Sequence, residues 1–295
     1  MSCAAAVPTA TARRAGRAAR WAWAALAASV LVAAGCGGAA PADGPAPADG
    51  PPATPPAATL APPSIERGPS PTAAAAAMPV DGPNATFAGV TLRWPDGLAE
   101  GASASTAPAS AGDPAAAPPA TRFRLDGYAD AAAPFDATVT VYRLGEGGPD
   151  LTDAVASLGA ILAERPAAPK VPMPATPASR LFTAQLAYLD GDGYAGVRFV
   201  TQLAQDIQPI HNRDLLYAFE GLSDDGTRWI QARLPIDAAS DAVLPGPNVV
   251  DYAAFAERFD AYLADATAAV DALPPDAFLP SLAALDAVVA GLALR

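Results

Sequence analysis

Apolar and polar residues alternate in three short segments of the chain, 90–94, 122–126 and 138–141. In each of them every second residue is apolar, which is the period of a half-buried β-strand. Pro95 follows the first segment and ends it, because proline cannot donate to a strand ladder. These patterns predict three strands in the first part of a sheet.

Two longer stretches, Leu181–Leu203 and Leu215–Leu234, each contain two apolar runs separated by Asp and Gly residues. The separating segments are Asp190–Gly193 and Asp224–Gly226. Asp-Gly between apolar runs is a strong signal for a β-hairpin. The second half of the chain therefore predicts two hairpins and four further strands.

Helical spacing of apolar residues occurs in three segments. Residues 151–162 follow Asp150, a suitable N-cap, and precede Pro166. Residues 252–270 and 282–292 carry further apolar stripes. These stripes need an apolar partner, and the sheet is the only large one. We expect an α+β fold in which an antiparallel sheet of about 6–8 strands is packed by about three helices.

The first 36 residues have the three regions of a signal peptide. Four arginines precede an apolar run from Trp21 to Ala34, which as a helix is only about 21 Å long. That run is short for a permanent membrane span. It ends in small residues before Cys36, an arrangement that resembles the lipobox of bacterial lipoproteins. The resemblance implies cleavage after residue 35 and lipid on Cys36. Ordinary cleavage, which would release a soluble secreted protein, is the alternative.

The remaining chain divides by composition. Residues 36–83 contain mainly Ala, Pro, Gly and Thr, and we expect a disordered tether there. Residues 84–295 form the predicted single domain, with a mobile low-complexity loop at about 102–120 and a strand at its start as an option. The expected location is the extracytoplasmic face of a cell membrane, with Cys36 holding the protein there.

The charge and the cysteine content limit which partners, disulfides and metal sites we expect. The net charge is −12, and it becomes −16 once the four leader arginines are removed. Such a surface repels phosphates, so nucleic acid is not an expected partner. The 2 cysteines are Cys3, lost with the leader, and Cys36. The mature domain therefore has no disulfide and no cysteine-based metal site, and we expect neither cofactor nor metal.

The middle of the domain resembles a family of exported bacterial proteins of unknown function. The resemblance is carried by VPMPATPASRLFTAQ, GVRFVTQLAQDIQPIHNRDLLYAFEGLSDDG and RWIQARLPI, and near the end by FLPSLAALDAVV. It implies an extracytoplasmic, often lipid-anchored domain and no particular activity. The family pattern commonly has Asn in the place of His211. More loosely, the expected strands and flanking helices look similar to the fold of the photosystem subunit PsbP.

Motifs for enzymatic chemistry are weak. His211 is the single histidine of the chain, and Asp214 is its nearest possible partner as an orienting acid. A histidine that caps a turn is the alternative that we favour. The sequence Asp190-Gly-Asp192-Gly departs from a calcium loop at its later positions and is interpreted as a turn. No nucleophile elbow, zincin pair or Walker loop occurs.

One polar set is less ordinary. Long polar side chains alternate with apolar residues in both hairpins, and alternation places each strand's polar residues on one side. A shared side would be either the solvated face of the sheet or a binding surface. The residues proposed for binding are Arg198, Gln202, Glu220, Trp229 and Arg233, with Thr183, Gln185 and Gln231 in the same phase.

Two functions from different classes follow. The first is a tethered, non-enzymatic binding or interaction domain that meets an unknown envelope ligand or partner at the cell surface. The second is a carboxylate-based hydrolase that acts on envelope polymer. A deep cleft that holds two acidic side chains would favour the hydrolase.

Overall fold

A computed structural model of the chain describes residues 82–110, 116–128, 135–176, 178–238, 249 and 251–295. The predicted signal peptide, Cys36 and the predicted tether up to residue 81 lie outside the described residues, so these interpretations stay predictions. Among the described residues, no helix has both the length and the apolar character that a membrane span requires.

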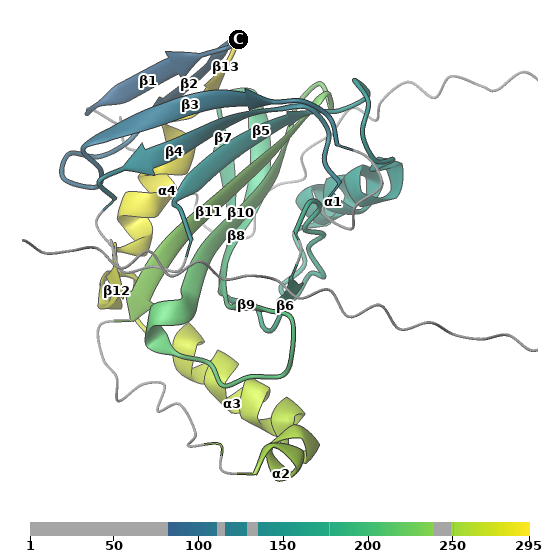
Figure 1. Ribbon diagram of the computed structural model, residues 1–295, viewed down its shortest axis with the longest axis vertical. Coiled ribbons are helices and arrows are strands. Elements are labelled where there is room, and N and C mark those ends of the chain that lie inside the picture. The colour runs from purple at the N-terminus through teal and green to yellow at the C-terminus, as the bar shows by residue number, and fades with distance from the viewer. Residues whose placement is uncertain (1–81, 111–115, 129–134, 177, 239–248, 250) are drawn as a thin grey trace, which may run out of the picture. The chain divides into compact units, whose positions relative to one another are not determined.

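The domain is built on one antiparallel sheet of eight strands (Figure 1). Seven of them are hydrogen-bonded in the order β3-β4-β5-β11-β10-β8-β7, and β12 pairs with the end of β11. The predicted α+β class is confirmed, while the likeness to PsbP stays a prediction. The strands are β3 (Gly101–Ala107), β4 (Ala120–Asp126), β5 (Thr138–Arg143), β7 (Ala184–Gly191), β8 (Tyr194–Thr201), β10 (Leu215–Ser223), β11 (Arg228–Ala238) and β12 (Phe278–Leu279).

Both predicted hairpins are present. β7 pairs with β8 and β10 pairs with β11, each in antiparallel register. The first turn is tight: Gly191 pairs with Tyr194, and Gly193 between them has a φ of +81°, which only glycine adopts without strain. Two smaller sheets complete the strands: β1 (Asn84–Phe87), β2 (Val90–Arg93) and β13 (Ala293–Leu294); and β6 (Ser179–Arg180) and β9 (Leu203–Ala204).

The predicted loop at 102–120 begins with a strand, which was the option left open for its start. Residues 101–107 form β3, which pairs along its whole length with β4. The sequence GASASTA has no large apolar residue, so it lacks the alternation by which a strand is recognised. It is ordered because the ladder with β4 is made by backbone groups, which every residue carries. Residues 111–115 lie outside the described part.

The described part of the chain has four α-helices where about three were expected: α1 (Thr152–Glu164), α2 (Tyr252–Glu257), α3 (Phe259–Asp271) and α4 (Leu282–Ala290). Three of them pack on the sheet, and α2 packs on α3 through Phe255. The apolar stripe of 252–270 forms two helices because the chain leaves helical geometry at Arg258, at φ −108° and ψ 9°. Asp150 is not the N-cap residue of α1, which is Leu151, but its carboxylate still accepts the N–H of Thr152 at 2.9 Å.

The helices cover opposite faces of the sheet (Figure 1). One face, here the α4 face, packs on α3 and α4 through the larger apolar core, which includes Phe123, Val141, Phe219 and Ile230. The other, here the α1 face, packs on Leu158 and Leu162 of α1 through a smaller core that includes Tyr142, Phe199, Leu216 and Trp229. Because side chains alternate along a strand, neighbouring residues belong to different cores.

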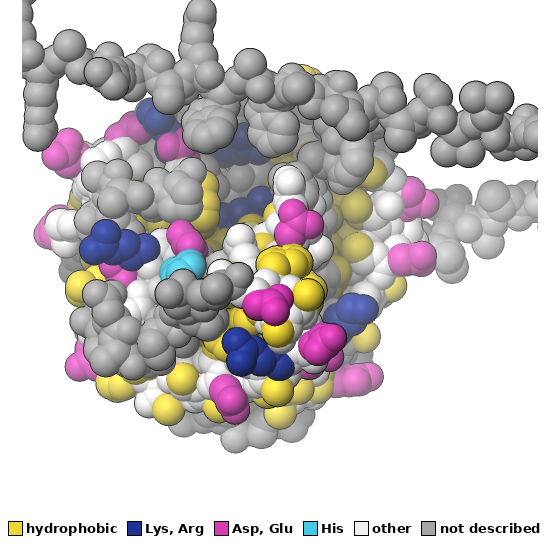
Figure 2. Space-filling view, turned by 60° about the horizontal axis from the view of Figure 1, so that its bottom comes forward, with side chains coloured by type: hydrophobic (Ala, Val, Ile, Leu, Met, Phe, Trp, Pro, Cys, Tyr) yellow, Lys and Arg dark blue, Asp and Glu magenta, His cyan; other side chains and the backbone are white. Residues whose placement is uncertain are grey.

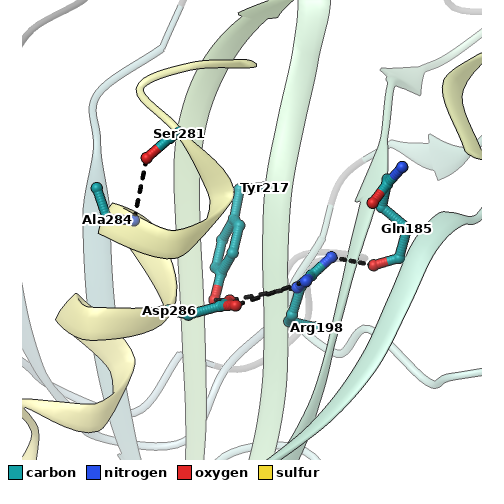
Figure 3. Close-up of polar contacts among 6 residues, drawn as sticks. All are labelled: Gln185, Arg198, Tyr217, Ser281, Ala284 and Asp286. Carbon is teal, nitrogen blue, oxygen red and sulfur yellow. Dashed lines mark hydrogen bonds and ion pairs between the residues drawn. The ribbon is translucent and has the colours of Figure 1, made fainter. Parts of the chain in front are cut away.

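Arg198 joins the sheet to α4 (Figure 3). Its Nε lies 3.2 Å from Oδ1 of Asp286, and the Tyr217 hydroxyl donates to the same oxygen at 2.8 Å. A second guanidinium nitrogen donates to the carbonyl oxygen of Gln185. The Arg198 side chain is only 10% exposed. It therefore belongs neither to a solvated face nor to a binding surface, and the prediction that placed it in a binding set is wrong.

Replacement of Arg198 by Ala should lower the free energy of unfolding by roughly 2 to 3 kcal/mol, because Asp286 would keep a largely buried charge without its cation. Urea unfolding of the whole chain measures this. Arg124→Ala is the matched control, because that arginine is half exposed and pairs with Asp126 on the surface, so its loss should cost no more than about 0.5 kcal/mol. Equal losses in the two variants would show that the pair does not hold α4.

Candidate functional site

The register of the sheet brings polar residues together on the α1 face. Across β4, β5, β11 and β10 a row of directly opposed residues runs Arg122, Thr140, Gln231, Glu220. In the adjacent row Arg233 lies opposite Thr138. Glu220, Trp229 and Arg233 thus share one face, as the alternation predicted. Arg198 does not share it, because it pairs with Phe219, the residue before Glu220.

Gln202 is not part of this surface. It follows the end of β8 and is 1% exposed. Its side chain donates to the carbonyl of Pro209 at 3.1 Å and accepts the N–H of His211 at 3.1 Å. Gln202 therefore holds the loop between β9 and β10 against the sheet.

Glu220 is a fully buried carboxylate. Its Oε2 accepts the indole N–H of Trp229 at 2.6 Å, and its Oε1 accepts the amide N–H of Gln231 at 2.9 Å. Burial raises the pKa of Glu220 from the ordinary 4.5 to about 7, and the two hydrogen bonds, together with the charges of Arg233 and Arg180, lower it only in part. Trp229 is itself fully buried, so its predicted exposure is wrong.

Hydrogen bonds connect this buried carboxylate to the surface. Gln231, which donates to Glu220, accepts the hydroxyl proton of Tyr142 at 3.3 Å. The Tyr142 oxygen in turn accepts from the guanidinium of Arg122. Burial, more than these neighbours, raises the pKa of Tyr142. Tyr142 and Gln231 lie in the middle of this chain, and each is oriented by a neighbour on both sides.

A cavity of about 560 Å³ opens above this chain of hydrogen bonds. Its floor is made by strand residues, namely Arg122, Thr138, Thr140, Tyr142, Gln231 and Arg233. Its walls come from the irregular segments around Ala175 and around Gln208, and from Phe135, Asp136, Ala178, Leu203, Asp214 and Leu216. Figure 2 shows that the molecular surface is hollowed beside the single histidine, with basic side chains inside the hollow.

The floor also holds one wall in place. The amide of Gln231 donates to the carbonyl of Pro174 at 3.3 Å, and the guanidinium of Arg233 donates to the hydroxyl of Thr176. Both acceptors belong to the crossover that leads from α1 to β6. The Nε of Arg233 is buried and has no hydrogen-bond partner among the described residues.

Part of this floor has a signal in the sequence. Arg122 alternates with Phe123, and Thr138 and Thr140 alternate with valines, in the same way as the polar residues of the hairpins. What periodicity could not provide is the strand order, which places β5 next to β11 and so joins the two polar sets. The wall segments around Ala175 and Gln208 are irregular and carry no such signal.

The remaining candidates, His211 and the segment Asp190–Gly193, take structural positions. His211 occupies the N-cap position of the short 3₁₀ helix η1 (Asn212–Asp214), but its exposed side chain makes no capping hydrogen bond. Its carbonyl accepts the N–H of Asp214 at 3.1 Å. Asp190–Gly193 is a hairpin turn, as interpreted. In the described part of the chain, no three His, Cys, Asp or Glu residues are grouped to hold a metal ion.

Compared with protein-family models, with curated proteins and with solved structures, the chain matches none. The resemblance to an exported bacterial family therefore stays a prediction.

Glu220 should make stability depend on pH. The unfolded carboxyl ionises near pH 4.5 but the folded one only near pH 7, so the free energy of unfolding should fall as pH rises between these values, by about 3 kcal/mol. Glu220→Gln cannot ionise, so its profile should lack this fall. Urea titrations at several pH values from 4 to 8 measure it, and the difference between the two proteins removes the effect of overall charge. Parallel profiles would contradict the burial of an ionisable Glu220.

Proposed function

We propose that this chain is a lipid-anchored extracytoplasmic protein whose domain binds a ligand in the cavity on the α1 face. The observation that carries the proposal is a cavity of about 560 Å³ above a polar floor in which Tyr142 donates to Gln231 and Gln231 donates to the buried Glu220. This volume lies within the range of small-molecule sites. A floor whose side chains are already oriented loses little entropy on binding, so it favours affinity.

The architecture supports binding over catalysis. Glu220 is the carboxyl group whose pKa is raised toward neutrality, as a general acid requires. It has no exposed surface, and Gln231 and Trp229 occupy its two oxygens. A substrate in the cavity would therefore meet Gln231 and not the carboxyl group. In this arrangement Glu220 serves to position a binding residue.

The sequence supports the location. A basic leader, a short apolar run and small residues before Cys36 fit lipid attachment, and an anchored domain would meet envelope ligands. The acidic net charge argues against nucleic acid as a partner. The unknown envelope ligand or partner of the sequence-based hypothesis then corresponds to the occupant of the cavity.

A carboxylate-based hydrolase is the second candidate, because Asp136 and Asp214 both line the same cavity. Asp136 is largely exposed, with 68% of its side chain accessible, and its Oδ1 lies 4.0 Å from Arg124. Asp136→Asn and Asp214→Asn separate the two functions. Each should abolish hydrolysis of envelope polymer if the chain is a hydrolase, and should leave ligand binding in place if it is a binding protein.

Cys36→Ser should move the protein from the membrane fraction to the soluble or secreted fraction, or leave an uncleaved precursor, because the serine hydroxyl cannot take the lipid in place of the thiol. Fractionation followed by intact-mass measurement tests this. A mature wild-type protein that starts elsewhere, with no added lipid mass, would refute the anchoring.

Ala178→Trp should close the cavity without touching its polar floor. A mixed panel of neutral sugars, peptides, carboxylates and phosphates is screened by thermal shift against the whole chain. At least one compound should raise the melting temperature of the wild-type protein and not that of the variant. Equal responses of both proteins to every compound would show that binding does not take place in the cavity.

A further inference from the structure

We propose that the ligand carries an oxyanion, a carboxylate or a phosphate, which binds between Arg122 and Arg233 on the floor of the cavity, while an apolar part of the ligand contacts Leu203 and Phe135. This inference rests on the proposed binding function and names the chemical class of the ligand.

Arg233 supplies the first argument. Arg233 is held on β11 and lines the cavity; among the described residues its guanidinium donates to the neutral hydroxyl of Thr176 and forms no ion pair with a carboxylate. A guanidinium has five N–H donors in a planar fork that matches a carboxylate or phosphate. An oxyanion in the cavity would therefore receive charge-assisted hydrogen bonds from the part of this fork that lines it.

The nearest buried carboxylate does not fill this role. Glu220 acts on Arg233 through its charge, but both of its oxygens are bonded to Trp229 and Gln231. Its raised pKa means that a substantial fraction of Glu220 is uncharged near neutral pH. Glu220 therefore neutralises the positive charge of Arg233 only in part.

Arg122 supplies the second argument. It lies in the same polar row of the sheet and donates to the hydroxyl of Tyr142, and it forms no ion pair with a described carboxylate. Arg124 on the same strand and Arg143 on the neighbouring strand β5 behave differently. A guanidinium nitrogen of Arg124 lies 2.9 Å from Oδ1 of Asp126, and Nε of Arg143 lies 2.7 Å from Oε2 of Glu146. In a strongly acidic chain, an arginine that lines a cavity and has no carboxylate partner among the described residues indicates an anionic ligand.

The rest of the lining limits the ligand to a small anion with an apolar body. Asp136 and Asp214 also line the cavity and would repel a ligand with negative charge at both ends. Leu203 and Phe135 offer apolar contact. One oxyanion at the arginines, joined to an uncharged and partly apolar group, satisfies both constraints.

The test uses three probes of equal chain length: hexanoate, hexyl phosphate and the neutral hexanamide. Isothermal titration of the whole chain at low salt should show that at least one of the two anions binds tenfold or more tightly than the amide. Preference between hexanoate and hexyl phosphate identifies the source of the oxyanion. Equal affinity for all three probes would overturn the proposal.

Variants locate the site. Arg122→Gln and Arg233→Gln should each weaken binding of the preferred anion about tenfold, the loss expected for one charge-assisted hydrogen bond. Arg143→Gln, on the neighbouring strand β5, is the matched control and should bind like the wild type, since neither Arg143 nor its partner Glu146 lines the cavity. Arg122 is exposed, so its replacement tests the site without endangering the fold. Unchanged binding in both cavity variants would overturn the proposal.

The outcomes separate this inference from the function on which it rests. A neutral compound that binds the wild-type protein but not Ala178→Trp, with no binding of either anion, would refute the anionic ligand and leave the binding function standing. If no compound distinguishes the wild-type protein from Ala178→Trp, the anionic ligand and the binding function are both refuted.

Discussion

The arrangement of the α1 face depends on a carboxylate that has no access to water. Glu220 lies in β10, near the centre of the sheet, where an ionisable group is stable only if its oxygens are bonded. The indole of Trp229 and the amide of Gln231 satisfy that requirement. Gln231, once oriented, accepts the hydroxyl proton of Tyr142 at its amide oxygen and donates from its amide nitrogen to the carbonyl of Pro174. A buried charge in the sheet thus determines both the floor of the cavity and the position of one wall.

Buried charged groups have different kinds of partner on the two faces of the sheet. On the α4 face, Arg198 meets the opposite charge of Asp286 and so attaches a helix to the strands. On the α1 face, Glu220 is bonded to neutral donors, while the guanidinium of Arg233 extends toward the cavity. A closed ion pair stabilises the packing of a helix. A carboxylate bonded to neutral groups leaves a cation available for something outside the protein.

Sequence periodicity was sufficient for the elements that alternate strongly. The two Asp-Gly hairpins and the fold class were predicted, because large apolar residues mark the buried side of each strand. The strand Gly101–Ala107 was hidden by its small residues, and it is ordered through backbone pairing with its neighbour. The polar set was misjudged in a specific way: alternation gives the phase within one strand, whereas the facing of Arg198 relative to Glu220 depends on a register that only long-range pairing determines.

The cavity takes its floor from strands and its walls from irregular segments, and this division has a consequence for change over evolutionary time. Substitutions in the floor disturb the ladder and the buried carboxylate, so they put folding at risk. Substitutions around Ala175 or Gln208 alter only surface segments, which tolerate exchange and insertion. Related domains could therefore keep one recognition chemistry and diverge in the shape of the molecule that they accept.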